Sequence, residues 1–384
     1  MSKVFEMIEK ERERQKNNVE LIASENFVSD DVLSAMSSCL TNKYAEGYSG
    51  KRYYGGCEFV DEVESYCQQM WKKAFQTDYH CNVQPHSGSN ANFAAYMALM
   101  QPGERAIGMD LDNGGHLTHG SPVNFSGKIF DFKSYGVLPD GKIDYCGLRE
   151  IAMQDKPKVI VSGASAYPRI IDFEAIRRIC DDCGAYMLVD MSHIAGLVLA
   201  GEHPSPFGLA DVITTTTHKT LRGPRGGMIF CKPELQRKVD SAVFPGTQGG
   251  PLEHIIAAKA VCAEEACAPE YKTYIRQVVL NARAMAERFV ENGFELVTGG
   301  TDNHLFLVDF TRTHPELTGL EAQNTLDAAG ITANKNCVPG EKRKPQLASG
   351  LRIGSPAMTT KGWREDDFIR CADTISELLK PWKV

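Results

Sequence analysis

The chain has 384 residues, of which 42% are hydrophobic, enough to bury a large core and to form two domains. A net charge of −7 with no long basic run argues against a nucleic-acid-binding surface. The 12 cysteines are scattered rather than spaced as a disulfide framework, the N-terminus is too charged for a signal peptide, and no apolar stretch approaches membrane-spanning length. We therefore expect a cytoplasmic protein that binds neither nucleic acid nor a membrane.

Strand-like and helix-like patterns alternate from about residue 80 to residue 232, which is typical of a mostly parallel sheet covered by helices. The Ala- and Met-rich run Ala91–Met100 predicts the first of these helices. The candidate strands that follow it are Arg105–Leu111, Lys158–Ser162, Tyr186–Val189, Asp211–Thr214 and Gly227–Cys231. The pattern indicates an α/β fold.

The C-terminal part of the chain has a different, α+β pattern. A long helix is predicted from Tyr274 to Val290, because apolar residues recur on one helical face and Asn292-Gly293 supplies a stop. Two strands and a last amphipathic helix are predicted over Phe294–Val297, His304–Phe310 and Phe368–Leu379. We expect an N-terminal arm and large domain over residues 1–270, followed by a smaller domain over residues 271–384.

The segment Gln84-Pro-His-Ser-Gly-Ser-Asn90, just before the first predicted helix, has the residue types of an anion site. Ser87 or Ser89 can cap the first turn, and Gly88 lets the backbone approach a ligand closely. The free N–H groups and the helix dipole then favour a phosphate. By itself the segment is more typical of an ordinary capped helix, so its interpretation depends on two residues later in the chain.

Those two residues, Asp190 and Lys219, follow neighbouring predicted strands. A lysine just past a buried strand can form a Schiff base once its ammonium loses a proton, and an aspartate beside it can hold a pyridinium nitrogen protonated. Either residue alone is a weak signal, because most lysines are solvated surface charges. Together with the anion segment they indicate a pyridoxal phosphate site.

Three other motifs are not interpreted as functional sites. Gly136–Lys142 has phosphate-loop spacing, but Ile143 stands where magnesium needs a hydroxyl, so we expect a turn between short strands. Cys180 and Cys183 lack a second pair of ligands at matching distance and are expected to be structural thiols. The Asn124-Phe-Ser126 sequon has no meaning without a secretory signal. We expect no metal site.

Longer motifs run in order through almost the whole chain. They are Glu20-Leu-Ile-Ala-Ser-Glu-Asn26, Thr41–Tyr48, Gly50–Gly56, Val83–Ser89, Gly114–Gly120, Val189–Gly196, Thr214–Lys219, Gly223–Gly227, Phe244–Pro251 and Ser349–Arg352. Together they resemble the signatures of the serine hydroxymethyltransferase family. The resemblance implies a fold-type-I pyridoxal-phosphate-dependent transferase with a large, mostly parallel α/β domain. It also implies the interconversion of L-serine and tetrahydrofolate with glycine and 5,10-methylenetetrahydrofolate.

The resemblance implies a cofactor site whose residues come from several of these motifs. Lys219 resembles the Schiff-base lysine, Asp190 the partner of the pyridine nitrogen and His116 the histidine that stacks on the ring. Thr216, in the Thr214–Lys219 motif, is expected to be a catalytic residue. The residues that match groups near the phenolic oxygen of the cofactor are Ser165 and His193. The residues that match the phosphate cradle are Ser87, Gly88, Ser89 and His218. Gly249 or Gly250 is expected to reach the phosphate of a neighbouring subunit, which implies a homodimer with shared sites.

The substrate residues are carried over in the same way. Arg352 matches the residue that binds the amino-acid carboxylate, a task suited to the planar fork of a guanidinium, and Ser24 assists it. Glu46 resembles the acid/base carboxylate between the serine hydroxyl and the folate. Moving a hydroxymethyl group requires protonating one oxygen and deprotonating another, which a partly buried Glu can do. The aromatic residues expected at the subunit interface are Tyr44, Tyr53 and Tyr54.

Leu111, Gly115, Leu117 and Asn336 match positions that contact folate in the family. The run from Gly340 to Ala348 lacks the Ser-Pro-Phe common in bacterial members, which puts folate affinity in doubt. Its basic residues Lys342, Arg343 and Lys344 either attract the glutamate tail of folate or form an ordinary solvated loop, and the loop is the more common case. Asn113 also replaces a histidine that is often found before the glycine pair.

Two other functions are compatible with some of these site residues. A folate-independent β-hydroxy amino-acid aldolase would use the same cofactor and lysine, but it has no need for Glu46, Leu117 and Asn336. A catalytically inactive protein that keeps the fold as a scaffold would be expected to have a broken site. Lys219, Asp190, Arg352 and Glu46 are all present, which favours the enzyme.

Overall fold

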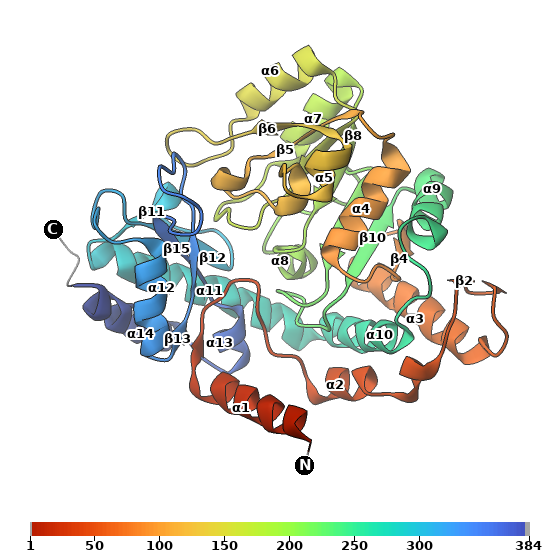
Figure 1. Ribbon diagram of the computed structural model, residues 1–384, viewed down its shortest axis with the longest axis horizontal. Coiled ribbons are helices and arrows are strands. Elements are labelled where there is room, and N and C mark those ends of the chain that lie inside the picture. The colour runs from red at the N-terminus through yellow and green to blue at the C-terminus, as the bar shows by residue number, and fades with distance from the viewer. Residues whose placement is uncertain (1, 381–384) are drawn as a thin grey trace.

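A seven-stranded sheet lies at the centre of the computed structural model, which describes residues 2–380 (Figure 1). In spatial order its strands are β4 (His80–Asn82), β10 (Gly227–Cys231), β9 (Val212–Thr216), β8 (Tyr186–Asp190), β7 (Val159–Ser162), β5 (Arg105–Met109) and β6 (Asp131–Tyr135). Neighbouring strands from β9 to β6 pair in parallel, whereas β10 is antiparallel to both β9 and β4. The sheet is therefore mostly parallel, as the sequence predicts.

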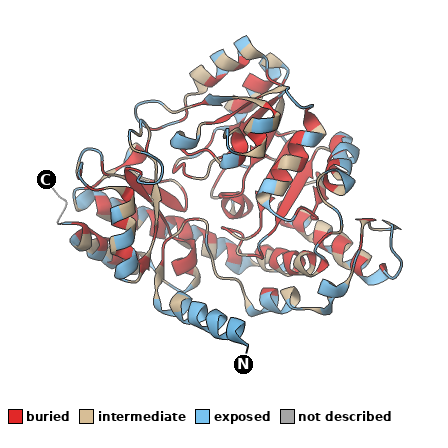
Figure 2. Cartoon of the chain, in the orientation of Figure 1, coloured by how far each residue is buried: buried red, intermediate tan, exposed pale blue. Residues whose placement is uncertain are grey.

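Helices cover both faces of this sheet, because successive side chains of a strand point to opposite faces. Ile107, Ile160 and Val189 pack into one core, whereas Ala106 and Val161 pack into another. The helices of the first core are α2 (Asp30–Met36), α3 (Glu58–Ala74), α6 (Tyr145–Asp155), α7 (Phe173–Cys183), α8 (Ala195–Ala200) and α10 (Glu253–Cys267). Those of the second are α4 (Gly88–Leu99), α5 (Phe125–Ile129) and α9 (Gln236–Ser241). Figure 2 shows the strands buried between these two layers.

A smaller antiparallel sheet belongs to the C-terminal part of the chain. Its strands are β11 (Glu295–Leu296), β12 (Leu305–Asp309), β15 (Gly350–Gly354) and β14 (Asn334–Asn336). The helices near it are α12 (Gly319–Ala328), α13 (Pro356–Thr360) and α14 (Glu365–Leu379). The N-terminal segment returns to this region, since β1 (Val19–Glu20) pairs in parallel with β13 (Ile331–Thr332). The preceding helix α1 (Lys3–Asn17) has no buried residue and projects from the body (Figures 1 and 2).

The long helix α11 (Pro269–Glu291) belongs to two hydrophobic cores at once. Ile275 and Val279 pack with the large sheet, whereas Met285 and Phe289 pack with the small one. The predicted helix is therefore present and longer than its periodic stretch. It ends before Gly293, whose φ of 87° lies in the left-handed region that glycine adopts without strain.

Most of the remaining sequence predictions agree with the structure, and the errors are short strands that were not predicted. All five predicted strands of the large sheet are present, but β4 and β6 were not predicted. The 136–142 segment is a turn, closed by a bridge between Val137 and Ile143, and Cys180 lies in α7 as a free thiol. Between residues 2 and 380, no helix combines the length and apolar character needed to cross a bilayer.

Candidate active site

A cavity of about 340 Å³ lies where the carboxyl ends of β8 and β9 meet the N-terminus of α4. In mostly parallel sheets, ligands bind in the crevice outside the carboxyl ends of the strands. The predicted cofactor and carboxylate residues that line it are Ser24, Ser87, Gly88, Ser89, His116, Ser165, Asp190, His193, Thr216, His218, Lys219 and Arg352. These residues are far apart in the sequence, so the fold brings them together. Glu25, His119, Ser192 and Arg225 also line the cavity and were not predicted.

One end of the cavity is built to hold an anion. Ser87 caps α4 by accepting a hydrogen bond at Oγ from the backbone N–H of Asn90, at 3.2 Å. A Cβ on Gly88 would lie 2.6 Å from Cγ2 of Thr216, so only glycine fits at the first turn. Thr216 Oγ1 and His218 Nδ1 are buried without a hydrogen-bond partner among residues 2–380, and both residues line the same cavity. The helix N-terminus and these unpaired groups together suit a phosphate.

Asp190 occupies a hydrogen-bonded position at the end of β8. Its Oδ2 accepts hydrogen bonds from Asn92 Nδ2 at 2.8 Å and from His119 Nε2 at 3.2 Å, and its Oδ1 accepts one from the Ser192 N–H at 3.0 Å. Burial alone would raise the pKa of Asp190, but the hydrogen bond from His119 and the charge of Lys219 outweigh this effect. The pKa therefore lies well below its ordinary value, and the carboxylate is ionised at neutral pH.

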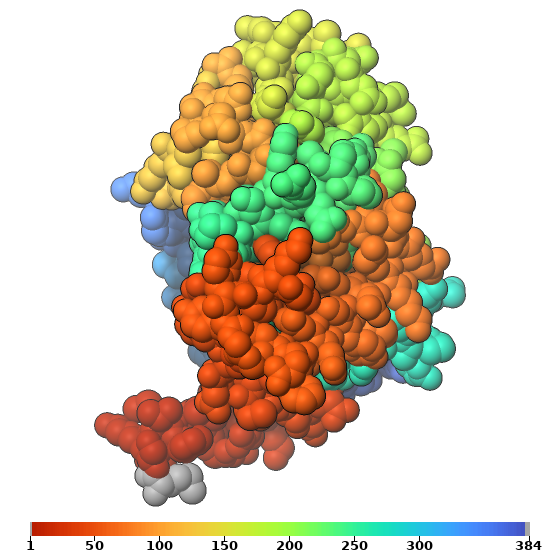
Figure 3. Space-filling model, turned by 90° about the vertical axis from the view of Figure 1, so that its right-hand side faces the viewer, coloured from red at the N-terminus to blue at the C-terminus, as the bar shows by residue number. Residues whose placement is uncertain are grey.

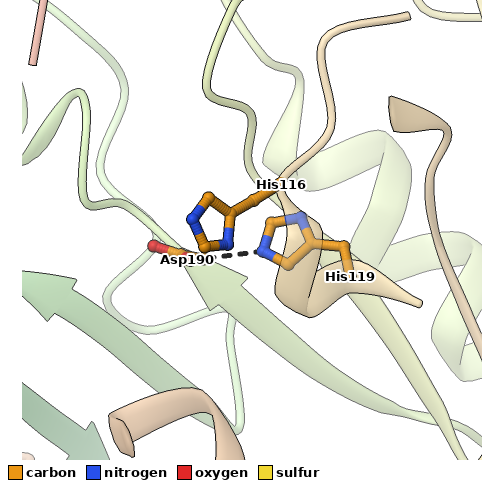
Figure 4. Close-up of side chains that lie close together, drawn as sticks. All are labelled: His116, His119 and Asp190. Atoms are coloured by element: carbon orange, nitrogen blue, oxygen red, sulfur yellow. Dashed lines mark hydrogen bonds and ion pairs between the residues drawn. The ribbon is translucent and has the colours of Figure 1, made fainter. Parts of the chain in front are cut away.

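His116 presents a defined face to this cavity. Its Nδ1 accepts a hydrogen bond from the Thr118 N–H at 3.2 Å and lies 2.7 Å from Thr118 Oγ1. Burial, and then the charge of His119, lowers the pKa of His116 to about 4, so the imidazole is neutral and carries its proton on Nε2. His116, His119 and Asp190 are also close enough to hold a metal ion (Figure 4). However, His116 Nδ1 and the Asp190 carboxylate already have protein partners, which favours a hydrogen-bond network.

Asn92 joins these groups. From α4 its amide nitrogen donates to Thr118 Oγ1 and Asp190 Oδ2, both at 2.8 Å, and its oxygen accepts a 2.6 Å hydrogen bond from Thr214 Oγ1. Asn92 was not among the predicted site residues. The available signal was an asparagine on the buried face of an Ala-rich helix, since buried polar groups need partners. His119 and Arg225 could have been found too, because they lie inside the Gly114–Gly120 and Gly223–Gly227 motifs.

Lys219 lies just past β9 and is only 9% exposed. Burial lowers its pKa to about 8, with Arg352 and Arg225 acting in the same direction and Asp190 opposing them. An appreciable fraction of Lys219 is therefore a neutral amine near neutral pH. That form is the nucleophile for a carbonyl carbon.

Arg352 reaches the cavity from β15 of the smaller sheet. Its guanidinium donates to the Ser165 carbonyl at 2.8 Å, to Asn334 Oδ1 at 3.2 Å and to Ser24 Oγ at 3.5 Å. Burial lowers its pKa to about 10, so it stays charged at neutral pH. A fixed guanidinium beside a hydroxyl is suited to a carboxylate.

His193 forms a contact between the large and small sheets. Its Nδ1 lies 3.2 Å from Nε2 of His304, and the two rings stack with their centroids 5.4 Å apart. Burial lowers the pKa of both, that of His304 to about 3. Two neutral imidazoles can share a single N–H between them, which fixes the orientation of His193 at the cavity.

A second cavity, of about 270 Å³, adjoins the first and shares His116 and Ser165 with it. All four predicted folate residues line it, namely Leu111, Gly115, Leu117 and Asn336. Cys337 and Pro345 also line it and were not predicted. Arg343, in the altered loop, donates to the Leu317 and Pro315 carbonyls and therefore ties the loop to the 315–317 segment, whereas Lys342 and Lys344 are exposed.

The remaining predicted residues form a separate cluster outside both cavities. Tyr44 and Tyr54 pack with ring centroids 5.0 Å apart, and a Cβ on Gly249 would lie 3.3 Å from Glu46 Oε1. A Cβ on Gly250 would lie 3.0 Å from the Tyr44 ring. The cluster lies at the edge of the chain, where the segment near β2 (Gly47–Tyr48) adjoins the segment before α10 (Figures 1 and 3). Tyr53, beside it, is 77% exposed.

The predicted site residues of one chain therefore lie in two separate groups, one around Lys219 and one around Glu46. A family model described as serine hydroxymethyltransferase matches residues 1–375. The chain belongs to this family. Serine hydroxymethyltransferases interconvert serine and glycine with tetrahydrofolate as cosubstrate and pyridoxal phosphate as cofactor, so this chain is a glycine hydroxymethyltransferase with the fold-type-I α/β architecture.

The residues around Lys219 fit the cofactor of a serine hydroxymethyltransferase. The Gly88 cradle has no room for a side chain, and Thr216 Oγ1 and His218 Nδ1 are buried groups without a partner in the described part of the chain. Burial, Arg225 and Lys219 lower the pKa of His218 to about 3, so it is neutral there. An ionised Asp190 and a readily deprotonated Lys219 complete a donor set suited to a phosphorylated pyridine aldehyde.

Proposed function

We propose that the Lys219 half-site binds the cofactor and the amino acid, and that the Glu46 half-site of a second copy completes it. The observation that carries this proposal is the burial of Lys219 in one cavity with Asp190, Arg352 and the α4 N-terminus. Bound there, pyridoxal phosphate supplies a ring that accepts the electrons of the bond broken at the α-carbon.

Each residue around the cofactor has a role that follows from its contacts. The amine of Lys219 would serve as the nucleophile for the cofactor aldehyde, since its pKa of about 8 leaves free amine available. Asp190, held ionised by its hydrogen bonds, would keep a proton on the ring nitrogen. Ser87, Gly88, Ser89, Thr216 and His218 would hold the phosphate, His116 would contact the ring face, and Ser165 and His193 would lie near the phenolic oxygen.

Arg352 and Ser24 bind the serine carboxylate. The guanidinium is buried and already held by the Ser165 carbonyl, so it is oriented before the substrate arrives. Pre-orientation lowers the entropic cost of placing the α-carbon. Leu111, Gly115, Leu117 and Asn336 form the folate slot, which adjoins the cofactor cavity at His116.

The acid/base residue Glu46 is outside the cavity of its own chain, which supports a homodimer with shared sites. Glu46, Tyr44 and Tyr54 lie together with Gly249 and Gly250 on an exposed edge. Placed against a second copy, this edge brings Glu46 to the serine hydroxyl and folate, and Gly249 or Gly250 to the phosphate. Glu46 then moves the proton at the serine hydroxyl oxygen.

The proposal also covers organisation and location. We divide the chain into an arm and large domain over residues 1–270 and a small domain over 271–384, supported by two separate hydrophobic cores that meet within α11. A cytoplasmic location is supported by the 12 free thiols, which persist most readily in a reducing compartment.

The deciding experiment measures glycine formation from L-serine with and without tetrahydrofolate, on protein checked for visible cofactor absorbance. Strong acceleration by tetrahydrofolate supports the proposal. Equal rates would favour the aldolase, and absent cofactor absorbance would favour the scaffold.

Leu117→Ala tests the folate slot in the same assay. It should raise the KM for tetrahydrofolate without changing folate-independent cleavage of a β-hydroxy amino acid. Leu138→Ala is the matched control, since Leu138 is exposed to a similar degree, 44% against 46%. An unchanged KM for tetrahydrofolate in the Leu117 variant would mean that Leu117 does not contribute to folate binding.

A further inference from the structure

Lys259 is a buried lysine that the reaction above does not use. It lies on α10 and is 1% exposed, more deeply buried than Lys219 itself. Its Nζ donates to three backbone carbonyls, those of Val83 at 2.7 Å, Pro85 at 3.1 Å and Gly227 at 2.7 Å. Since a buried ammonium is costly to desolvate, its presence needs a specific reason.

The three contacts require the charged form of this lysine. An ammonium has three N–H donors and no acceptor, so it matches three carbonyl oxygens. A neutral amine would point its lone pair at one of those oxygens. Burial lowers the pKa of Lys259 to about 8, which still leaves it mostly protonated at neutral pH.

The carbonyls that Lys259 binds belong to the two segments that shape the phosphate cradle. Val83 and Pro85 lead into Ser87, the cap of α4. Gly227 begins β10 and faces that cap closely, because a Cβ on Gly227 would lie 2.3 Å from the Ser87 carbonyl oxygen. The Gly227 N–H also donates to the Pro85 carbonyl at 3.0 Å.

The lysine stem extends beneath the active-site lysine loop as well. A Cβ on Gly226 would lie 2.5 Å from Cε of Lys259 and 3.2 Å from Thr217 Oγ1. The Thr217 N–H donates to the Gly226 carbonyl at 3.2 Å, and His218 and Lys219 follow directly. One side chain therefore supports both loops that converge on the phosphate end of the cavity.

We propose that Lys259 is a positioning residue for phosphate binding, acting by holding the Pro85–Ser87 turn against Gly227 beneath the α4 N-terminus. It touches neither cofactor nor substrate in this assignment. Its buried positive charge adds to the field of the helix N-terminus, which favours a dianion. The inference rests on the proposed cradle of Ser87, Gly88 and Ser89.

The test compares equilibrium binding of pyridoxal phosphate and of pyridoxal, which lacks the phosphate, to the apo forms of wild type and Lys259→Met. Lys259→Met should weaken pyridoxal phosphate binding at least about tenfold and leave pyridoxal binding nearly unchanged. The factor corresponds to the free energy of one of the charge-assisted hydrogen bonds with which Lys259 holds the backbone carbonyls in place. Inorganic phosphate should also compete less well with pyridoxal phosphate. Equal losses for both ligands, or no loss for either, would overturn the proposal.

Two further variants keep the result interpretable. Lys232→Met is the matched control: Lys232 lies just past the other end of β10 and pairs with Asp211 at 2.7 Å, so its loss should leave the ratio of the two affinities unchanged. Gly226→Ala displaces the Lys259 stem without removing its charge, and it replaces Lys259→Met as the test if that variant folds poorly. It should also weaken the binding of pyridoxal phosphate but not that of pyridoxal. If wild type binds pyridoxal as tightly as pyridoxal phosphate, the cradle assignment itself fails, irrespective of Lys259.

Discussion

The division of the site between two copies of the chain can be tested with two inactive variants. Lys219→Ala damages the cavity half-site, and Glu46→Ala damages the exposed cluster beside Gly249. Each homodimer is expected to lose about 10²-fold or more in kcat, because it lacks the nucleophilic lysine or the acid/base group at every site. The informative species is the heterodimer of the two variants.

The expected activity of that heterodimer follows from the geometry. If each site takes Lys219 from one chain and Glu46 from the other, one site of the heterodimer carries both mutations and the other carries neither. The heterodimer should therefore have about half the wild-type kcat per dimer with an unchanged KM for serine. Co-expression with two different affinity tags and sequential purification isolates it.

A matched control uses two residues of the same cavity. Lys219 and Asp190 line one cavity in one chain, so a Lys219→Ala and Asp190→Ala heterodimer has one mutation at each site and should stay inactive. If the Lys219 and Glu46 pair also stays inactive, the shared site is refuted. Recovery by both pairs would point instead to residual activity in the variants.

Three further predictions follow from single side chains. Arg352→Lys should raise the KM for serine about tenfold in steady-state kinetics, because an ammonium cannot replace the planar fork; an unchanged KM would place the carboxylate elsewhere. The rate of pyridoxal phosphate uptake by the apoenzyme should rise as pH increases through about 8, because burial lowers the pKa of Lys219 to that value and only the neutral amine reacts; stopped-flow absorbance checks this, and a flat profile contradicts it. Phe289→Ala should lower the free energy of unfolding by about 3–5 kcal/mol in urea titrations, because its ring is fully buried in the core of the small sheet, and a loss below about 1 kcal/mol would mean that the core repacks.

The central fold could be predicted because its signals are local. The strands of Ile160 and Val189 are largely apolar runs buried on both faces, and α4 and α11 have regular patterns with clear ends. The short strand β4 and the partly exposed β6 lack such a run, so only pairing with distant strands defines them.

The site was predictable to the extent that its residues lie in recognisable motifs. Asp190, Lys219 and the Ser87 cap each follow from a strand end or helix start. Without the Ser349–Arg352 family motif, Arg352 would be only a charged residue beside a short strand, because its contact with the Ser165 carbonyl joins residues 187 positions apart. The Asn92 junction and the His304 contact likewise depend on tertiary neighbours. No periodicity in one segment can reveal a hydrogen bond to another.

The charges of the cavity suggest why ligands and stability should be coupled in this protein. Burial keeps His116, His193 and His218 neutral, and the lysine and arginine charges lining the cavity, those of Lys219, Arg225 and Arg352, face the two carboxylates of Asp190 and Glu25. Buried cations that outnumber the anions beside them destabilise a fold, and a bound phosphate or carboxylate compensates the excess. Inorganic phosphate should therefore raise the melting temperature of the apoenzyme more than chloride does at the same ionic strength. Equal effects of the two salts would mean that the cavity cations are already compensated within the protein. The cavity would then have no particular affinity for phosphate.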